Sequence, residues 1–206
     1  GGIEANQIRL SSDTLDNRGG RVVSMEDLPL QVHSQLQNQA GLISSNKALS
    51  IAGGKQLLID NGSGSISAVE NLSLNSAQLL NAGCVITNKQ RDISAGEIHN
   101  RGELSAAGKQ NLHSTNLHNS GSIASNAQLN IATIDLDNQN GDISAEHLQI
   151  TAQQLNNQAG VIAQTGLAGL ELDAGVLSNN QGIIGYRPED NTAQPTQPNS
   201  GTGTGS

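Results

Sequence analysis

The sequence predicts an all-β protein, a right-handed parallel β-helix (solenoid) of about ten coils of ~19 residues each. Two strict repeats carry this prediction. A glycine recurs every 19 to 23 residues and is followed two positions later by an aliphatic residue; these glycines are Gly1, Gly20, Gly41, Gly64, Gly83, Gly102, Gly121, Gly141, Gly160 and Gly182. Each complete repeat closes on an aliphatic residue, any residue and an asparagine; these asparagines are Asn17, Asn38, Asn61, Asn81, Asn100, Asn119, Asn138, Asn157 and Asn179.

Within one repeat, apolar and polar side chains alternate, as in Leu129-Asn130-Ile131. A period of two is typical of a strand that faces a core on one side. Each repeat is therefore expected to form two or three short strands, with bends at Gly and Asn, where a positive φ costs little. Coils stacked at the ~4.8 Å strand spacing would pair every backbone amide with a neighbouring coil and give a rod of about 45 Å.

The composition fits a narrow core rather than a globular one. The 206 residues include no Phe or Trp and a single Tyr, and 34% of them are hydrophobic. A globular core of this length normally contains large aromatic side chains, whereas rings would disturb the stacking of slim coils. We therefore expect Leu, Ile, Val and Ala inside the coils and the abundant Ser, Asn, Gln and Thr mostly outside.

Charge and hydropathy argue against two kinds of partner. The formal net charge is −8 and the sequence pI is about 4.9, so the clustered Lys and Arg that bind nucleic acid phosphates are missing. No apolar run approaches the ~18–20 residues that span a bilayer, and no basic amphipathic helix is present to lie on one. We expect no nucleic acid partner and no membrane insertion.

The asparagine column has a functional and a structural interpretation. Nine amides in a row could form a ladder that binds a ligand. Asn stacked in register also hydrogen-bonds its copy in the next coil and tolerates a left-handed turn. A position that is Asn in every complete coil is one that every coil needs, whereas a binding site would occupy one level only, so the sequence favours a structural ladder.

The repeat pattern is broken in the fifth and sixth coils, which predicts a surface polar cluster there. Arg91 and Gln110 stand where other coils have an aliphatic residue, and His99 and His118 precede the repeat asparagines, as does Asp137 one coil later. A stacked His-His-Asp column is a possible set of ligands for a divalent metal. Exposed polar ladders on solenoids are usually only solvated, so we expect no metal and no cofactor.

Motifs for catalysis are missing. The sequence has no Gly-x-Ser-x-Gly, no phosphate-binding glycine loop, no His-Glu-x-x-His and no paired cysteines. Cys84 has no associated His and Asp and is expected to face outward without a catalytic role. The alternative is a carbohydrate-active β-helix enzyme, a polysaccharide lyase or hydrolase. Such enzymes need clustered charged residues and aromatic rings, which the coils lack, so we expect no enzyme.

Segments such as Leu15–Gly20 and Leu155–Ala163 resemble the haemagglutinin repeats of filamentous haemagglutinin-like exoproteins, and the resemblance covers residues 1–185. It implies a rod that is secreted or attached to the surface of a Gram-negative bacterium, at its outer membrane. It also implies export by two-partner secretion, which requires an outer-membrane secretion partner. The family includes adhesins and the stalks of contact-dependent growth inhibition effectors. The implied role is adhesion to a receptor or glycan on a host or neighbouring cell, or presentation of a distal binding or toxin domain.

The repeats end before a stretch of different composition. Residues 186–206 hold three of the four prolines and no aliphatic pattern, which predicts a disordered linker or tail after a β-helix at 1–185. The chain starts in mid-pattern without an initiator Met, as expected for a piece of a longer protein. Pro29 and the insertion around Gly53-Gly54-Lys55 interrupt the second and third coils and predict loops that bulge from the rod.

Overall fold

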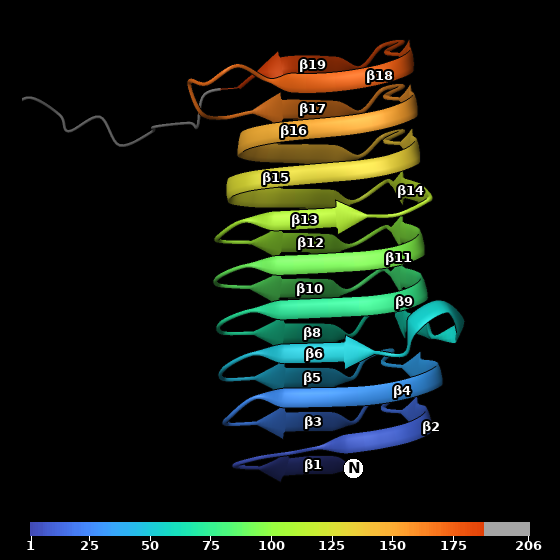
Figure 1. Ribbon diagram of the computed structural model, residues 1–206, viewed down its shortest axis with the longest axis vertical. Helices are drawn as coiled ribbons and strands as arrows, with labels where there is room; N and C mark the ends of the chain where they lie inside the picture. Colours follow the sequence, from blue (N-terminus) through green and yellow to red (C-terminus); the bar gives the residue numbers. More distant parts are fainter. Residues whose placement is uncertain (188–206) are drawn as a thin grey trace, which may run out of the picture.

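The chain is a parallel β-solenoid of about ten turns, with ~19 residues per turn, in the computed structural model. The structure describes residues 1–187; the predicted tail lies outside these residues, apart from Tyr186, which ends β19, and Arg187. In Figure 1 the chain rises from its N-terminus and passes from right to left at the back and from left to right at the front. This is the right-handed sense that the sequence predicts.

The first side of each coil is a strand that begins just after the repeat glycine. These strands are β1 (Gly2–Ala5), β3 (Arg21–Ser24), β5 (Leu42–Ser45), β8 (Ser65–Ala68), β10 (Cys84–Thr87), β12 (Glu103–Ala106), β17 (Val161–Gln164) and β19 (Ile183–Tyr186), together with the first residues of β15 (Ser122–Asp137) and β16 (Asp142–Asn156). From β3 to β17 the aliphatic residue of this side is buried, whereas the residue before it is exposed or half-buried.

The second and third sides of each coil meet at a bend. In most coils one strand runs through both sides: β2 (Leu10–Asp16), β4 (Leu28–Gln37), β9 (Leu72–Asn81), β11 (Arg91–Asn100), β18 (Glu171–Ser178) and the remainder of β15 and β16. In two coils the bend separates two strands: β6 (Leu49–Ala52) from β7 (Leu58–Asn61), and β13 (Gln110–His113) from β14 (Asn116–Asn119). Each coil therefore has three sides, where the alternation predicted two or three strands.

The core is a set of aliphatic columns that run along the rod axis. Successive coils pair in parallel with equivalent residues opposite one another, for example Ile123 with Ile143 and Leu136 with Leu155. On the second side the inward residues include Leu28, Leu49, Leu72, Leu129 and Leu148, all at most 2% exposed. Because each coil contributes only a few inward side chains, the core is continuous along the axis but narrow across it.

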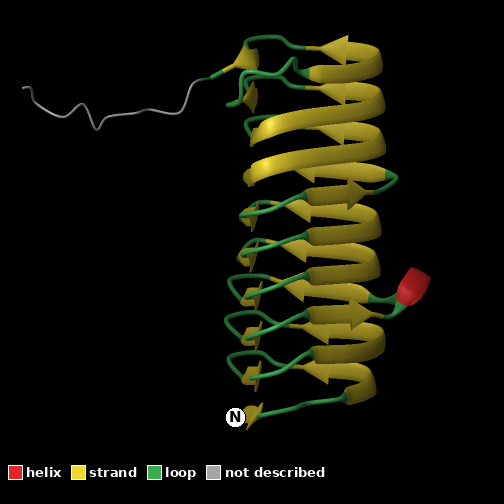
Figure 2. Ribbon diagram, turned by 60° about the vertical axis from the view of Figure 1, so that its left-hand side comes forward, coloured by secondary structure: helices red, strands yellow, loops and turns green. Residues whose placement is uncertain are grey.

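The two interruptions behave differently. The insertion in the third coil is confirmed as a protruding loop, which contains the 3₁₀ turn η1 (Gly54–Gln56) and is drawn in red in Figure 2. Leu57, just after η1, returns to the core and is fully buried. The bulge predicted at Pro29 is wrong, because Pro29 lies within β4 opposite Ser50. The Leu28 amide donates to the Ala48 carbonyl in the third coil, so the next amide along the strand would point the opposite way, toward the first coil. Pro29 lacks this amide, and the part of the first coil that it would face, just before β2, is not paired with β4.

No helix in the described part of the chain has the length and apolar character needed to cross a membrane.

Candidate functional site

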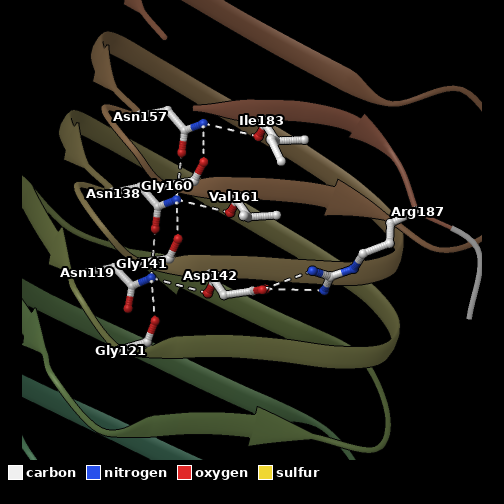
Figure 3. A network of polar contacts seen from close by, with 10 residues as sticks. All are labelled: Asn119, Gly121, Asn138, Gly141, Asp142, Asn157, Gly160, Val161, Ile183 and Arg187. Carbon is white, nitrogen blue, oxygen red and sulfur yellow. Dashed lines mark hydrogen bonds and ion pairs between the residues drawn. The ribbon is translucent and has the colours of Figure 1, made fainter. Parts of the chain in front are cut away.

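The nine repeat asparagines lie one above another at the corner between the third side and the next coil. From Asn17 to Asn157, each side-chain Nδ2 donates to the Oδ1 of the asparagine one coil further on, as Figure 3 shows for Asn119, Asn138 and Asn157. The eight donor–acceptor distances are 2.7 Å for Asn17–Asn38, 2.8 Å for Asn38–Asn61, Asn61–Asn81, Asn81–Asn100 and Asn100–Asn119, and 2.7 Å for Asn119–Asn138, Asn138–Asn157 and Asn157–Asn179.

The ladder amides are also bonded to the backbone. Asn100 Nδ2 donates to the Ser122 carbonyl at 3.0 Å and to the Gly102 carbonyl at 3.2 Å, besides its bond to the next asparagine. From Asn17 to Asn157 the ladder asparagines are at most 6% exposed. Their donors are therefore used inside the rod, and these eight asparagines present no free amide to a ligand from solvent.

The five residues predicted to form one surface cluster separate into two groups. Arg91 and Gln110 are fully buried, so their placement on the surface is corrected. Both belong to the inward column of the second side, where Arg91 pairs with Leu72 below and Gln110 above, and Gln110 pairs with Leu129. The sequence contained the signal for this burial, because the same column is aliphatic in other coils.

Arg91 is a charged side chain inside an aliphatic core. Its Nη1 donates to the backbone carbonyls of Val85 and Ser105, while its Nε and Nη2 have no partner among the described residues. Both polar atoms of the Gln110 side chain are also buried without a partner. Loss of hydration disfavours the charged guanidinium and lowers the Arg91 pKa from its ordinary value to about 9, and the carboxylate of Glu103 only partly opposes this shift. Arg91 and Gln110 therefore lower the stability of the folded chain at this level of the core.

His99, His118 and Asp137 form the second group, on the outer face of the third side. The two imidazole rings are stacked with centroids 4.8 Å apart and planes 16° apart. His118 Nδ1 lies 3.6 Å from Asp137 Oδ2, and His99 Nε2 lies 3.4 Å from Glu97 Oε2. Sequence reasoning missed Glu97, which lies two residues before His99 and therefore on the same outer face of the strand.

Hydrogen bonds to the Glu97 carboxylate favour its ionised form. Gln78 Nε2 donates to Glu97 Oε2 at 2.7 Å, and this bond is the main reason why the Glu97 pKa is lowered, with His99 second. Asp137 Oδ1 accepts hydrogen bonds from Asn156 Nδ2 at 2.9 Å and from the backbone N–H of Gln139 at 3.2 Å. The carboxylates on either side of the histidine stack are therefore held in fixed positions.

The turn from asparagine to glycine is one residue shorter in three consecutive coils. The other turns read Asn-x-x-Gly, and in five of them the residue before the glycine has a positive φ: Gly19, Ala40, Asn140, Ala159 and Gln181. The short turns read Asn-x-Gly and are Asn81–Gly83, Asn100–Gly102 and Asn119–Gly121. The surface is hollowed beside these turns, between the longer turns Asn61–Gly64 and Asn138–Gly141.

Two adjoining hollows result, which we call together the third-side groove. One, of about 330 Å³, is lined by His99, Asn100, Arg101, His118, Asn119, Ser120, Asp137, Gln139 and Asn140. The other, of about 300 Å³, is lined by Asp60, Gly62, Leu80, Asn81, Ala82, His99 and Arg101. His99 and Arg101 border both hollows, so the groove runs along the rod axis from the third coil to the seventh. The sequence signal for it is the run of three Asn-x-Gly turns.

Ligands for a metal do not converge in the described part of the chain. Residues 1–187 contain no group of three or more His, Cys, Asp or Glu side chains placed to hold an ion. In the histidine stack, His99 and His118 turn different ring nitrogens toward different carboxylates, so they do not point to one centre. Cys84 is a free, half-buried thiol at the start of β10, on the outward side of the strand next to buried Val85.

Three stretches of the chain, residues 3–58, 38–103 and 105–184, match the family model of the haemagglutinin repeat. They extend from the first strand to the last and include the asparagine ladder and the third-side groove. No curated protein and no solved structure shows a significant match to the chain.

Proposed function

Because the chain belongs to the haemagglutinin repeat family, we propose that it is a rod segment of a filamentous haemagglutinin-like exoprotein, which holds a distal binding or toxin domain away from the cell. Haemagglutinin repeats occur in secreted and surface exoproteins of this type, and they are typically non-enzymatic adhesin repeats. The single observation that supports the rod function best is the unbroken stack of parallel coils with its continuous asparagine ladder.

The physical basis is that such a stack resists bending and local unfolding. Each coil pairs its backbone with two neighbours, and the buried amide ladder adds a second line of hydrogen bonds along the axis. Adding or removing a coil changes the length by one strand spacing, ~4.8 Å, without changing the cross-section. A segment of this kind sets a distance, and that is what a stalk requires.

The remaining parts of the proposal concern location and partners. The parent protein is exported through an outer-membrane secretion partner and stays at the bacterial surface or is released from it. Its target is a receptor or glycan on a host or neighbouring cell, reached by the full-length protein. The family match supports these points through the proteins in which such repeats occur.

Deleting one coil tests the spacer function. We would remove the 19 residues 102–120, which joins Arg101 to Gly121 and keeps an Asn-x-Gly turn. Spin labels at Cys84, and at a cysteine introduced in place of Ser144, report the length by pulsed electron resonance. The label distance should fall by ~4.8 Å while the far-ultraviolet circular dichroism per residue stays the same. A loss of fold after deletion, or an unchanged distance, would contradict a modular rod.

Surface location is tested in the bacterium that produces the protein. An epitope tag inserted between Gly54 and Lys55 lies in the protruding η1 loop, so it should not disturb the coils. Antibody should label the tag on intact cells, and deletion of the secretion partner should abolish this labelling. Labelling only after the cells are lysed would refute the proposed location.

The enzyme alternative is tested by incubation with acidic plant and bacterial polysaccharides. Asp60 and Asp137 lie at the two ends of the third-side groove, four coils apart, which corresponds to about 19 Å. The two carboxylates of a glycosidase lie within ~5–10 Å of each other. We therefore expect no chain cleavage. Turnover that disappears on mutation of these aspartates would refute the rod function as the sole activity.

A further inference from the structure

The third-side groove has the form of a ligand site rather than of a regular solenoid surface. Within residues 1–187 it lies beside three successive Asn-x-Gly turns, and residues at or next to the longer turns Asn61–Gly64 and Asn138–Gly141 line its two ends. We propose that this groove binds a short, uncharged oligosaccharide of two to three hexose units laid along the rod axis. The proposal adds a ligand site to the proposed rod function.

The polar groups of the groove match the hydroxyl groups of a sugar. The side chains of Arg101, Ser120 and Gln139 make no hydrogen bond within residues 1–187, so a ligand can use them without breaking an internal contact. Asp137 supplies a carboxylate that is already fixed by two hydrogen bonds. The groove therefore offers both donors and acceptors, and a hydroxyl group can use both.

The stacked imidazoles present a polar edge to the same ligand. One ring nitrogen of His99 faces Glu97 and one of His118 faces Asp137, and neither imidazole has another hydrogen-bond partner in the described chain. The ring nitrogens that remain, Nδ1 of His99 and Nε2 of His118, belong to rings whose centroids lie 4.8 Å apart. Leu80, 37% exposed on the floor of the adjoining hollow, offers an apolar surface for the C–H face of a pyranose.

The axial direction of the groove suits an extended chain of sugars. The groove crosses four coil spacings of ~4.8 Å each, about 19 Å in all. A ligand along the axis can thus place successive sugars beside Leu80, His99 and His118, one coil after another. A chain of two or three hexose units fits within the length of the groove.

Charge favours a neutral ligand over an acidic one. Asp60 lies at one end of the groove and Asp137 at the other, with Glu97 beside the histidine stack, against a single guanidinium from Arg101. The whole chain carries a formal charge of −8. A polyanionic sugar would be repelled by the local and the overall field.

The test compares sugars and a matched pair of arginine variants. Cellotriose and chitotriose serve as neutral probes and trigalacturonate as the acidic probe, and binding to the 206-residue chain is followed by titration calorimetry and by chemical shifts of the His99 and His118 rings. We expect at least one neutral trimer to bind and Arg101→Ala to weaken it about tenfold. Arg18→Ala should have no effect, because Arg18 holds the same place after its asparagine but lies outside the groove.

A second variant fills the groove without removing any side chain. Inserting an alanine between Arg101 and Gly102 creates the turn Asn-Arg-Ala-Gly, the form that Asn38–Gly41 already takes with Ala40 at a φ of 54°. The coils should stay folded by circular dichroism, and binding should fall at least tenfold. Failure of both neutral trimers to bind, binding that survives the insertion, or tighter binding of trigalacturonate would each overturn the proposal. None of these results would contradict the rod function, which is tested separately by deletion of a coil.

Discussion

Replacing Arg91 with leucine should make the protein more stable, although Arg91 is one of the most deeply buried residues. The substitution restores the aliphatic column of the second side, where Leu72 lies one coil below and Leu129 two coils above. It also removes two nitrogens, Nε and Nη2, that are buried without a partner. Desolvated polar groups cost free energy in the folded state only, so removing them favours folding.

The magnitude follows from the shift in the Arg91 pKa. Burial lowers this pKa from its ordinary value to about 9, and one pKa unit corresponds to about 1.36 kcal/mol, so the desolvated charge costs at most about 5 kcal/mol. The variant loses the bonds that Nη1 makes to the carbonyls of Val85 and Ser105, and leucine fills less space than arginine. We therefore expect a net gain of about 2–4 kcal/mol, in line with other replacements of buried charges.

The assay is thermal and guanidinium unfolding followed by circular dichroism. For a chain of this size the gain corresponds to a rise in Tm of roughly 4–16 °C. Leu129→Ala, in the same column, is the control for a change of volume alone and should destabilise by about 2–5 kcal/mol. A solenoid can unfold in parts, so the comparison should use variants whose transitions have the same steepness.

The pH dependence provides an independent check on the cause. The folded-state pKa of Arg91 lies below its unfolded value, so below pH about 9 both states are charged and the full penalty is present. As the pH rises above about 9, the folded protein gives up its proton first, and the wild type gains stability relative to Arg91→Leu. An Arg91→Leu variant less stable than the wild type at pH 7, or a stability difference constant from pH 8 to 10.5, would refute this reasoning.

Three further predictions concern the ladder, the turns and a surface pair. Asn100→Ala should destabilise by about 2–4 kcal/mol, because it removes buried bonds on both sides of the ladder, whereas Asn179→Ala at the exposed end should change unfolding by less than about 1 kcal/mol. In Gly83→Ala the new methyl group would overlap a backbone carbonyl of the coil below, so Tm should fall by several degrees; an unchanged Tm would show that the turn can relax. The Asp16 carboxylate should titrate at about 2 by carbon NMR, because its hydrogen bonds with Arg18 favour the charged form, and Arg18→Ala should return it to its usual value near ~3.9. Low pH should therefore break this pair only as the pH falls toward 2, and a wild-type titration near 4 would contradict the bond.

Some features of the site are only partly visible in sequence. The run of Asn-x-Gly turns is a local signal for the groove, but it becomes meaningful only when the turns are known to lie side by side. His99 and His118 are 19 residues apart and stack because their coils pair in exact register. Glu97 completes the arrangement through the alternation of the strand. Arg91 and Gln110 were recognised in the sequence as breaks in the repeat, but their burial was not predicted, because Arg and Gln side chains are usually exposed.

The sequence by itself determined the solenoid, the number of coils and the position of the ladder, since a fixed period with an inward aliphatic residue and a closing asparagine in each coil leaves few other ways to pair the backbone. The tertiary structure decided that Arg91 and Gln110 lie inside, apart from the outer group of His99, His118 and Asp137, and that the two imidazole rings stack. The physical reason is that the direction of a side chain is set by its place in a column shared with neighbouring coils. A polar residue in an inward column stays inside at a cost in free energy, because moving it out would shift the register of the entire strand.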